Sequence, residues 1–456
     1  MAETNTMVEL QELAEFVAAL TFADLPDEVV EHAKWVVRDS IGVLIAGMRE
    51  PEVAALAAYA ARSAPGPCTL FGHPGTTTPE WAAMVHGTAG TSLEMDEGHA
   101  FARGHASIHA VPPALALAQP HKLPGKDALT AVVAGYEVAA RAGVATHLRK
   151  GVHPFGAWGV LGAAAVGAKI AGLDGKGVAE VLELAASYAI TPSFETAYQG
   201  ANVRNTYAGI VNFLGLSAAT FYGLGFRGEV GGLQTAFGEI LGDRFNPEAL
   251  IEDLGERYEI MRGYFKPYSA CRYAHGTIDA LLGLTREHPV MPQQIRSIQV
   301  ATYDIAAGLR EPEPTTPLAG RFSIPYVVAT TLSLGTAGPE AYSLKHLGDE
   351  AIRALAARVE VVEDPAFTKL TPGKRPARVT LTLTDGTELQ HTVMGSKGDP
   401  DQPMSEQELT DKFFSLVQPS LREEQARQAW QMLADLEHLP DLELIEATLR
   451  PQRRDV

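Results

Sequence analysis

The sequence predicts a mainly α protein, with a large all-helical domain and a smaller α+β domain. Apolar residues recur at the spacing of an amphipathic helix over most of the chain up to about residue 260. Residues 295–303 instead alternate between apolar and polar side chains, as a half-buried strand does. The same alternation in residues 377–384 and 387–393, on either side of Asp385-Gly386, is a strong signal for a hairpin.

The helices expected in the first 260 residues have recognisable beginnings and buried faces. Residues 8–20 are amphipathic, and Pro26-Asp27-Glu28 opens the next helix, because proline and acidic residues favour a first turn. Nearly all the later segments carry alanine and glycine among their apolar positions, so neighbouring helices can approach closely. The expected helices cover residues 8–20, 26–46, 51–62, 79–91, 107–118, 126–146, 157–171, 176–189 and 205–222.

The rest of the chain divides into an α+β part and a return to helix. Further helices are expected at residues 275–284, 323–334, 347–357, 405–417, 423–433 and 440–447. The last three follow Gly398-Asp399-Pro400 and could pack on the first helices, which would make the helical domain discontinuous. The predicted domains are residues 1–264 with 402–456, all-helical, and residues 265–401, an α+β lid.

Composition excludes several classes of protein. A chain of 456 residues exceeds the size that one hydrophobic core usually supports, so two domains are expected. The net charge of −18 argues against nucleic acid or an anionic membrane as a partner. Cys68 and Cys271 are too few to ligate the cluster of an iron–sulfur dehydratase. Because the N-terminus has no basic-then-apolar pattern, we expect a cytoplasmic protein without disulfides.

Residues 94–109 form the segment richest in titratable side chains that could serve in catalysis. They contain three carboxylates, Arg103 and three histidines, and we expect them to form a loop that leads into a helix near Ser107. Structural loops seldom need three imidazoles, whereas proton-transfer sites often do, because histidine titrates near neutrality. A solvated charged loop is the alternative interpretation.

Two motifs in the chain suggest a metal or a cofactor but lack the necessary context. His105 and His109 are four residues apart, as zinc ligands on a helix can be, but the glutamate of an H-E-x-x-H motif is missing. Gly223 to Gly228 spell a dinucleotide fingerprint, but the segment follows a helix instead of a strand. We therefore expect no metal and no cofactor, and we expect a helix end and turn at Gly223.

Basic and titratable residues also gather near the proposed domain junction. The run from Lys266 to His275 contains Lys266, Arg272 and His275, and in an acidic protein such a cluster suggests a pocket for an anionic ligand. His153 lies in a turn before a Gly/Ala-rich helix, where it is either a core histidine or a base that acts on an acidic C–H bond.

Two further residues complete the candidate set. Arg204 precedes another apolar helix and could offer a bidentate fork to a carboxylate. Tyr326 places a hydroxyl at the start of a helix. Each of these residues alone is more easily explained as structural, but together they suggest a site for a di- or tricarboxylate.

The chain resembles the MmgE/PrpD family, which includes 2-methylcitrate dehydratase, cis-aconitate decarboxylase and iminodisuccinate epimerase. The resemblance covers nearly the whole chain and rests on residues 94–105, Gly-Val-His-Pro at 151–154, Lys-Pro-Tyr-x-x-Cys-Arg-x-x-His at 266–275 and Phe-Ser-Ile-Pro-Tyr at 322–326. It implies a large helical domain with an α+β lid, the last helices rejoining the first domain, and a homodimer. It also implies a pocket between the domains that needs neither metal nor cofactor.

Carried over by position, the resemblance implies the pocket residues: Glu94 or Asp96 as the acid, His105 and His153 as the histidine pair, Lys266 from the junction and Tyr326 from the lid. The residues expected to bind substrate are Glu94, Asp96, Arg103, Arg204, Arg272 and His275.

The chain departs from the family pattern at two positions. Family members often have lysine where this chain has Arg204, and threonine where it has Gly98. Arg204 keeps the positive charge but cannot transfer a proton as lysine can, and Gly98 lacks a hydroxyl. The loop that contains Gly98 is also longer than in the decarboxylase, so the substrate of a named member does not transfer directly.

The expected chemistry is removal of a proton α to a carboxylate. Lys266 and Arg204 would stabilise the carbanion, His153 would act as base, and His105 would act as acid on the leaving hydroxyl. We expect a lyase for a small hydroxy-di- or tricarboxylate, of the 2-methylcitrate dehydratase type. An epimerase or decarboxylase of a related acid is the alternative enzyme, because one pocket can host all three reactions. A carboxylate-binding protein without turnover is the non-enzymatic alternative.

Overall fold

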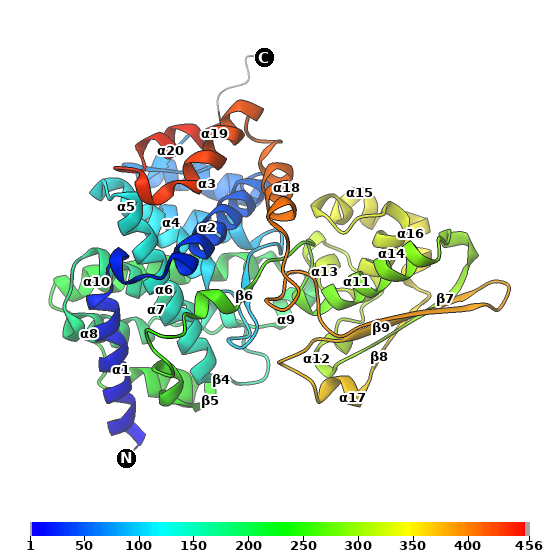
Figure 1. Cartoon of the computed structure of the whole chain (residues 1–456), viewed down its shortest axis with the longest axis horizontal. Helices are drawn as coiled ribbons and strands as arrows, with labels where there is room; N and C mark the ends of the chain where they lie inside the picture. The colour runs from blue at the N-terminus through cyan, green and yellow to red at the C-terminus, as the bar shows by residue number, and fades with distance from the viewer. Residues whose placement is uncertain (1, 452–456) are drawn as a thin grey trace.

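The computed structural model describes residues 2–451, which form a helical part and an α+β part side by side (Figure 1). The larger hydrophobic core draws on residues from Leu10 to Phe265 and again on residues from Met404 to Leu449. The smaller core contains Ala197 and residues from Ala270 to Leu381. The protein is therefore mainly α with a smaller α+β region, as the sequence predicts.

The helical part is built mainly from eight helices of the first half of the chain. These are α1 (Ala2–Ala19), α2 (Asp27–Gly47), α3 (Pro51–Ser63), α4 (Pro79–Thr91), α5 (Val111–His121), α6 (Gly125–Ala145), α7 (Gly159–Ile170) and α8 (Gly175–Ala186). A ninth long helix, α10 (Thr206–Gly223), packs on both α4 and α7. The predicted helices are confirmed, with ends that shift by a few residues.

Glycines allow α10 to lie unusually close to its neighbours. A Cβ on Gly209 would lie 2.3 Å from the Met84 carbonyl oxygen of α4, and one on Gly215 would lie 2.5 Å from the Val160 carbonyl oxygen of α7. Neither position therefore tolerates a side chain. The helix ends at Gly223 and the chain turns through Gly225, whose φ is +98°. The residues that match the dinucleotide-binding motif therefore lie at a helix end, as predicted.

One helix in the described residues, α6, is long and apolar enough to cross a membrane. Within its apolar window, 94% of the residues are buried inside the protein. It packs against α7 and α5, as a central core helix does.

The α+β part contains a four-stranded sheet in the order β10-β9-β7-β8. β7 (Ile295–Thr302) and β10 (Glu388–Val393) both run antiparallel to β9 (Ala377–Leu383). The predicted hairpin is thus confirmed, and Gly386 at its turn has a φ of +90°. β8 (Val359–Glu363) pairs in parallel with β7 and was not predicted.

Helices of the α+β part pack against the sheet and against one another. They include α11 (Arg272–Glu287), α14 (Ile324–Leu334) and α16 (Glu350–Ala356). The helix predicted at 347–357 is present but begins at Glu350, because Leu347 ends the short helix α15 (Leu344–Leu347). Asp349 accepts hydrogen bonds from Ala351 N and Ile352 N and so begins α16 anew.

The last helices return to the helical part, as the orange and red ribbon of Figure 1 shows. They are α18 (Glu406–Val417), α19 (Glu423–Ala434) and α20 (Glu443–Thr448). Lys412 of α18 places its Nζ 2.6 Å from Asp39 Oδ1 of α2 and 2.8 Å from the Met95 carbonyl oxygen. The buried ion pair therefore fixes α18 to α2, and the second hydrogen bond fixes it to the segment that follows α4.

Candidate active site

A cavity of about 40 Å³ lies where the two parts meet. Segments far apart in the sequence line it, and the α+β part contributes residues from Cys271 onward. The lining residues are Glu94, Arg103, His105, His153, Pro154, Phe194, Arg204, Tyr264, Cys271, Arg272, Tyr273, Phe322 and Arg375.

The loop after α4 differs from its prediction in detail. Instead of running freely to a helix at Ser107, it forms a short strand, β3 (Gly98–His99), that pairs with β6 (Gly263–Tyr264). A 3-10 turn covers Ser107–His109, and α5 begins at Val111. The Tyr264 hydroxyl occupies the space beside Gly98, since a Cβ at Gly98 would lie 2.5 Å from it.

Glu94 lies between two buried cations. Its Oε2 is 3.1 Å from Lys266 Nζ, and its Oε1 pairs with the Arg204 guanidinium. Burial raises the pKa of a carboxyl group, but Arg204 and then Lys266 outweigh burial and lower the pKa of Glu94. Glu94 is therefore ionised at neutral pH, and it adopts a left-handed backbone with a φ of +54° to reach this position.

Asp96 orients His105. Its Oδ2 is 3.0 Å from His105 Nδ1, which also lies 2.9 Å from the Glu97 carbonyl oxygen. Both neighbours are acceptors, so Nδ1 carries a proton and donates it, and Nε2 is the free edge of the ring. Against the opposing effect of burial, His105 and Lys266 keep the pKa of Asp96 below its ordinary value.

His153 is a buried, neutral imidazole. Its Nδ1 accepts from Phe155 N at 3.3 Å, and its Nε2 faces Arg204 Nε at 3.3 Å. Phe194 stacks on the ring at 4.8 Å between centroids. Burial, followed by the positive charge of Arg204, lowers the pKa of His153 well below its usual value. Of the two cavity histidines, one thus pairs with a carboxylate and the other faces a cation.

The remaining basic residues divide between the cavity wall and the layer behind it. Arg272 lines the cavity and binds Asp399 Oδ1 at 2.6 Å. It also donates to His275 Nδ1 at 3.1 Å, and His275 Nε2 donates to the Ala270 carbonyl oxygen, so His275 supports Arg272 from outside the cavity. Arg103 lines the cavity with an exposed side chain.

Tyr326 is not among the residues that line the cavity. Its side chain is 1% exposed in the smaller core, and its hydroxyl donates to the Ala341 carbonyl oxygen at 2.9 Å. Phe322, four residues earlier, lines the cavity instead. The aromatic packing of α14 against Tyr342 accounts for this position, because it turns the Tyr326 ring into the α+β core.

Three cavity residues lie outside every motif that the sequence analysis singled out: Phe194, Tyr264 and Arg375. Arg375 lies just before β9, and its Nη2 donates to the Ala100 carbonyl oxygen at 3.4 Å. The sequence around it, Gly373-Lys374-Arg375-Pro376, predicts a turn but carries no sign that this turn meets the loop after α4.

No metal site is evident in residues 2–451, which contain no group of three or more His, Cys, Asp and Glu side chains suited to hold an ion. His109 donates from Nδ1 to Asn212 Oδ1 at 2.9 Å within the helical core, and burial lowers its pKa to about 4. His99, the third histidine of the loop, has its Nε2 3.0 Å from Glu259. Both histidines hold the local fold together.

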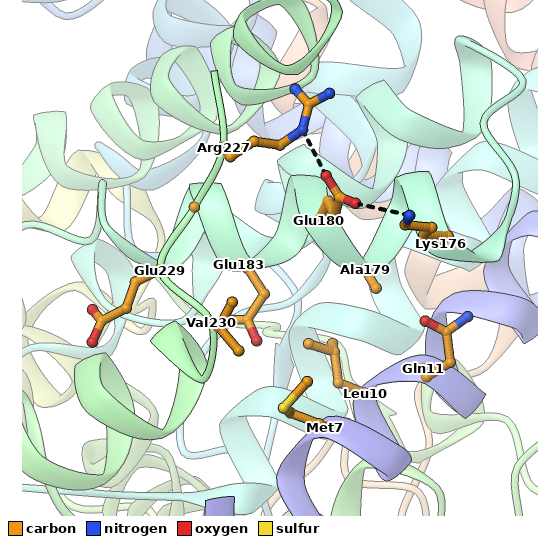
Figure 2. Close-up of a pocket in the computed structure, with 11 residues that line it drawn as sticks. Met7, Leu10, Gln11, Lys176, Ala179, Glu180, Glu183, Arg227, Glu229 and Val230 are labelled. Atoms are coloured by element: carbon orange, nitrogen blue, oxygen red, sulfur yellow. Dashed lines mark ion pairs between the residues drawn. The ribbon is translucent and has the colours of Figure 1, made fainter. Parts of the chain in front are cut away.

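A larger cavity, of about 430 Å³, lies between α1, α8 and residues 227–230 (Figure 2). Figure 2 shows Lys176 and Arg227 on either side of Glu180. The nitrogen–oxygen distances of these two ion pairs are 3.9 and 2.8 Å. Its lining contains neither histidine nor cysteine. Its titratable groups are carboxylates and basic side chains, and it therefore lacks the imidazoles that line the smaller cavity.

Comparisons with known proteins place the chain in one family. The model of the MmgE/PrpD N-terminal domain matches residues 11–238, and that of the MmgE/PrpD C-terminal domain matches residues 268–438. The cis-aconitate decarboxylase-like protein oryM of Aspergillus oryzae is 24% identical, over 94% of this chain and 95% of that protein. Cis-aconitate decarboxylase of Aspergillus terreus is 24% identical over 94% of each chain. The Homo sapiens enzyme of that name is 25% identical over 96% of this chain and 94% of its own. The two domain matches together cover most of the chain, which therefore belongs to the MmgE/PrpD family of enzymes.

Proposed function

We propose that the protein is a lyase that transfers a proton at a carbon α to a carboxylate of a small di- or tricarboxylate. The observation that carries this proposal is the arrangement of His105 and His153 around one cavity with Arg204, backed by Lys266. A proton-transfer reaction needs a base and an acid in one pocket, and a developing carboxylate-stabilised carbanion needs fixed positive charge.

His153 is suited to remove or return the proton. Because its pKa lies well below the usual value, the ring is neutral at physiological pH and can accept a proton. The Arg204 guanidinium beside Nε2 disfavours the charged ring, so the accepted proton is readily passed on.

His105 is suited to the opposite role. Asp96 fixes the ring through Nδ1, and a carboxylate at this distance compensates the positive charge that the ring carries when it acts as an acid. In a dehydration, this proton would go to the leaving hydroxyl. In a decarboxylation, loss of carbon dioxide leaves an electron pair on carbon, and the proton would go to that carbon.

The named relatives make cis-aconitate the first substrate to test, with decarboxylation as the reaction. A 2-methylcitrate-type hydroxy acid is the second, because the Asp96–His105 pair also provides the acid that a dehydratase needs. A cavity of about 40 Å³ holds only a few water molecules, so either substrate requires the cavity to widen.

Proton NMR in deuterated water tests the proposal with cis-aconitate, 2-methylcitrate, citrate and substituted succinates. Loss of the alkene signal of cis-aconitate with a new decarboxylated product establishes a decarboxylase. Appearance of an alkene from a hydroxy acid establishes a dehydratase, and deuterium uptake without net conversion indicates an epimerase.

Two variants make the NMR test specific to the site. His153→Ala should abolish the observed reaction, while the matched control His147→Ala, at a half-exposed histidine paired with Asp243, should retain it. Full activity in His153→Ala would contradict the assignment of the base. Binding of polycarboxylates without any exchange or turnover would support the non-enzymatic alternative.

A further inference from the structure

The charges around the cavity do not all serve the same purpose. Lys266 and Arg204 are expected to stabilise the charge that develops at the reacting carbon. Glu94 and Asp96 already pair with them, two carboxylates for two cations, so they leave no unpaired positive charge for the other carboxylates of a substrate. Arg272 is likewise paired, with Asp399. A substrate that carries two or three carboxylates therefore needs positive charge from elsewhere.

Arg375 supplies such a charge. The residue is 7% exposed and lines the cavity, and it forms no ion pair within residues 2–451, although the charge of Asp399, which binds Arg272, also acts on it. Nη2 donates to the Ala100 carbonyl oxygen, whereas Nη1 is buried and has no hydrogen-bond partner. A buried guanidinium nitrogen without an acceptor is costly, and a ligand carboxylate would remove that cost.

The position of Arg375 suits a group remote from the reacting carbon. It lines both the 40 Å³ cavity and a neighbouring cavity of about 230 Å³. The Tyr264 and Tyr273 rings lie beside its guanidinium, at 5.5 and 5.6 Å from their centroids. The guanidinium therefore lies where both cavities can be reached.

Arg103 adds a second unpaired cation to the same site. Its side chain is exposed while lining the cavity, and no ion pair is formed by it among the described residues. Its backbone adopts a left-handed conformation with a φ of +55°, which is unfavourable for arginine and is held by the Ala100 to Gly104 turn.

We propose that Arg375, assisted by Arg103, binds the substrate carboxylate that is remote from the proton-transfer pair and so selects di- and tricarboxylates over monocarboxylates. This inference rests on the proposed function, because it assigns recognition within that same site. A guanidinium suits the role, since its planar fork matches a carboxylate with two parallel hydrogen bonds.

Calorimetric titration of the whole protein with tricarballylate tests the inference, because this tricarboxylate lacks both a leaving hydroxyl and an alkene. Wild type should bind tricarballylate and bind butyrate far more weakly. Arg375→Met should lower the affinity for tricarballylate at least about tenfold and leave butyrate binding unchanged. Arg103→Met should give a smaller loss. The matched control Arg378→Met, at an arginine paired with Asp364 outside both cavities, should bind as wild type does.

The possible results separate this inference from the proposed function. If wild type binds tricarballylate and Arg375→Met binds it equally well, the inference is overturned and the proposed function stands. If wild type binds neither tricarballylate nor any polycarboxylate of the NMR panel, both fail. Should circular dichroism show that Arg375→Met is unfolded, Arg375→Gln removes the charge but keeps a polar side chain, and an unchanged affinity in that folded variant would overturn the inference.

With a turned-over substrate, the same variants provide a kinetic readout. Because the remote carboxylate is bound equally in the ground state and in the transition state, Arg375→Met should raise KM while kcat changes little. A loss confined to kcat would instead place Arg375 in the chemical step and contradict the inference.

Discussion

Replacing Lys266 by methionine should destabilise the protein in a pH-dependent way. The Lys266 side chain is fully buried, and its Nζ lies 3.1 Å from Glu94 and 3.7 Å from Asp96. Methionine has a similar length but no charge, so the variant leaves two buried carboxylates with less compensation. Removing one partner of a buried ion pair costs roughly 3–5 kcal/mol. Because Arg204 still pairs with Glu94 and His105 with Asp96, we expect a value near the lower limit, about 3 kcal/mol at pH 7.

The pH dependence follows from the pKa shifts of the two acids. In the wild type the pKa values of Glu94 and Asp96 are lowered, so their contribution to stability is present above their unfolded-state values and is lost as the pH falls through their folded-state values. Without Lys266 the folded-state pKa values rise. The difference between variant and wild type should therefore be largest near pH 7 and should shrink toward pH 4, where protonation relieves the uncompensated charge.

Urea unfolding followed by circular dichroism at several pH values measures this difference. Lys176→Met is the matched control, because its exposed side chain is 3.9 Å from Glu180 and should contribute nothing measurable. The double variant Lys266→Met/Glu94→Gln should recover part of the stability lost in Lys266→Met, because it also removes one of the uncompensated carboxylates. An equal loss at pH 4 and pH 7, or no loss at all, would refute the reasoning that Lys266 compensates these carboxylates.

Three further predictions concern single residues. His153→Ala should slow turnover of the substrate found by NMR at least about 100-fold. Because burial lowers the pKa of His153, wild-type activity should persist well below pH 6.5. A fall in activity with a midpoint near pH 6.5 would contradict this. Burial raises the pKa of Glu97 to about 7, whereas its pKa in the unfolded chain is 4.5. Protonated Glu97 therefore contributes fully to the free energy of unfolding below pH 4.5, and this contribution is lost as the pH rises through 7. In Glu97→Gln, the free energy of unfolding measured by urea titration should fall by about 3 kcal/mol less over this pH range than in the wild type. The same pH profile in both proteins would count against a protonated Glu97. Gly98→Thr should lower the melting temperature through its clash with the Tyr264 hydroxyl, and Tyr264→Ala should relieve that loss in the double variant; additive losses would show that no clash exists.

Local signals predicted most of the fold. The helices of the first half and the hairpin turn at Asp385-Gly386 follow from residue periodicity and turn chemistry, which act over a few residues. β8 was missed because it is a half-exposed strand of five residues that follows directly on a helix and pairs in parallel with a distant strand. Parallel pairing leaves no hairpin signal in the sequence.

The site was predictable where its residues lie in unusual local sequence. The clustering of Glu94, Asp96 and His105 drew attention to the loop, and the structure brings them to a cavity with Arg204. Arg375 lies in an ordinary turn, so its burial beside the loop depends on tertiary packing alone. Tyr326 shows the opposite case, because its position at a helix start suggested a site but the α+β core buries its ring.

The contact between Lys412 and the Met95 carbonyl oxygen has a consequence for biosynthesis. The two residues are 317 positions apart, and Met95 lies between Glu94 and Asp96. A ribosome makes the chain from its N-terminus, so the loop that carries these acids is completed long before the lysine that fixes it. A nascent chain that stops short of α18 leaves the Asp39 carboxylate without its cation in the core. We expect catalytic competence to arise only after α18 has been made, and chains that terminate before α18 to be substrates for cellular proteases instead of partly active enzymes.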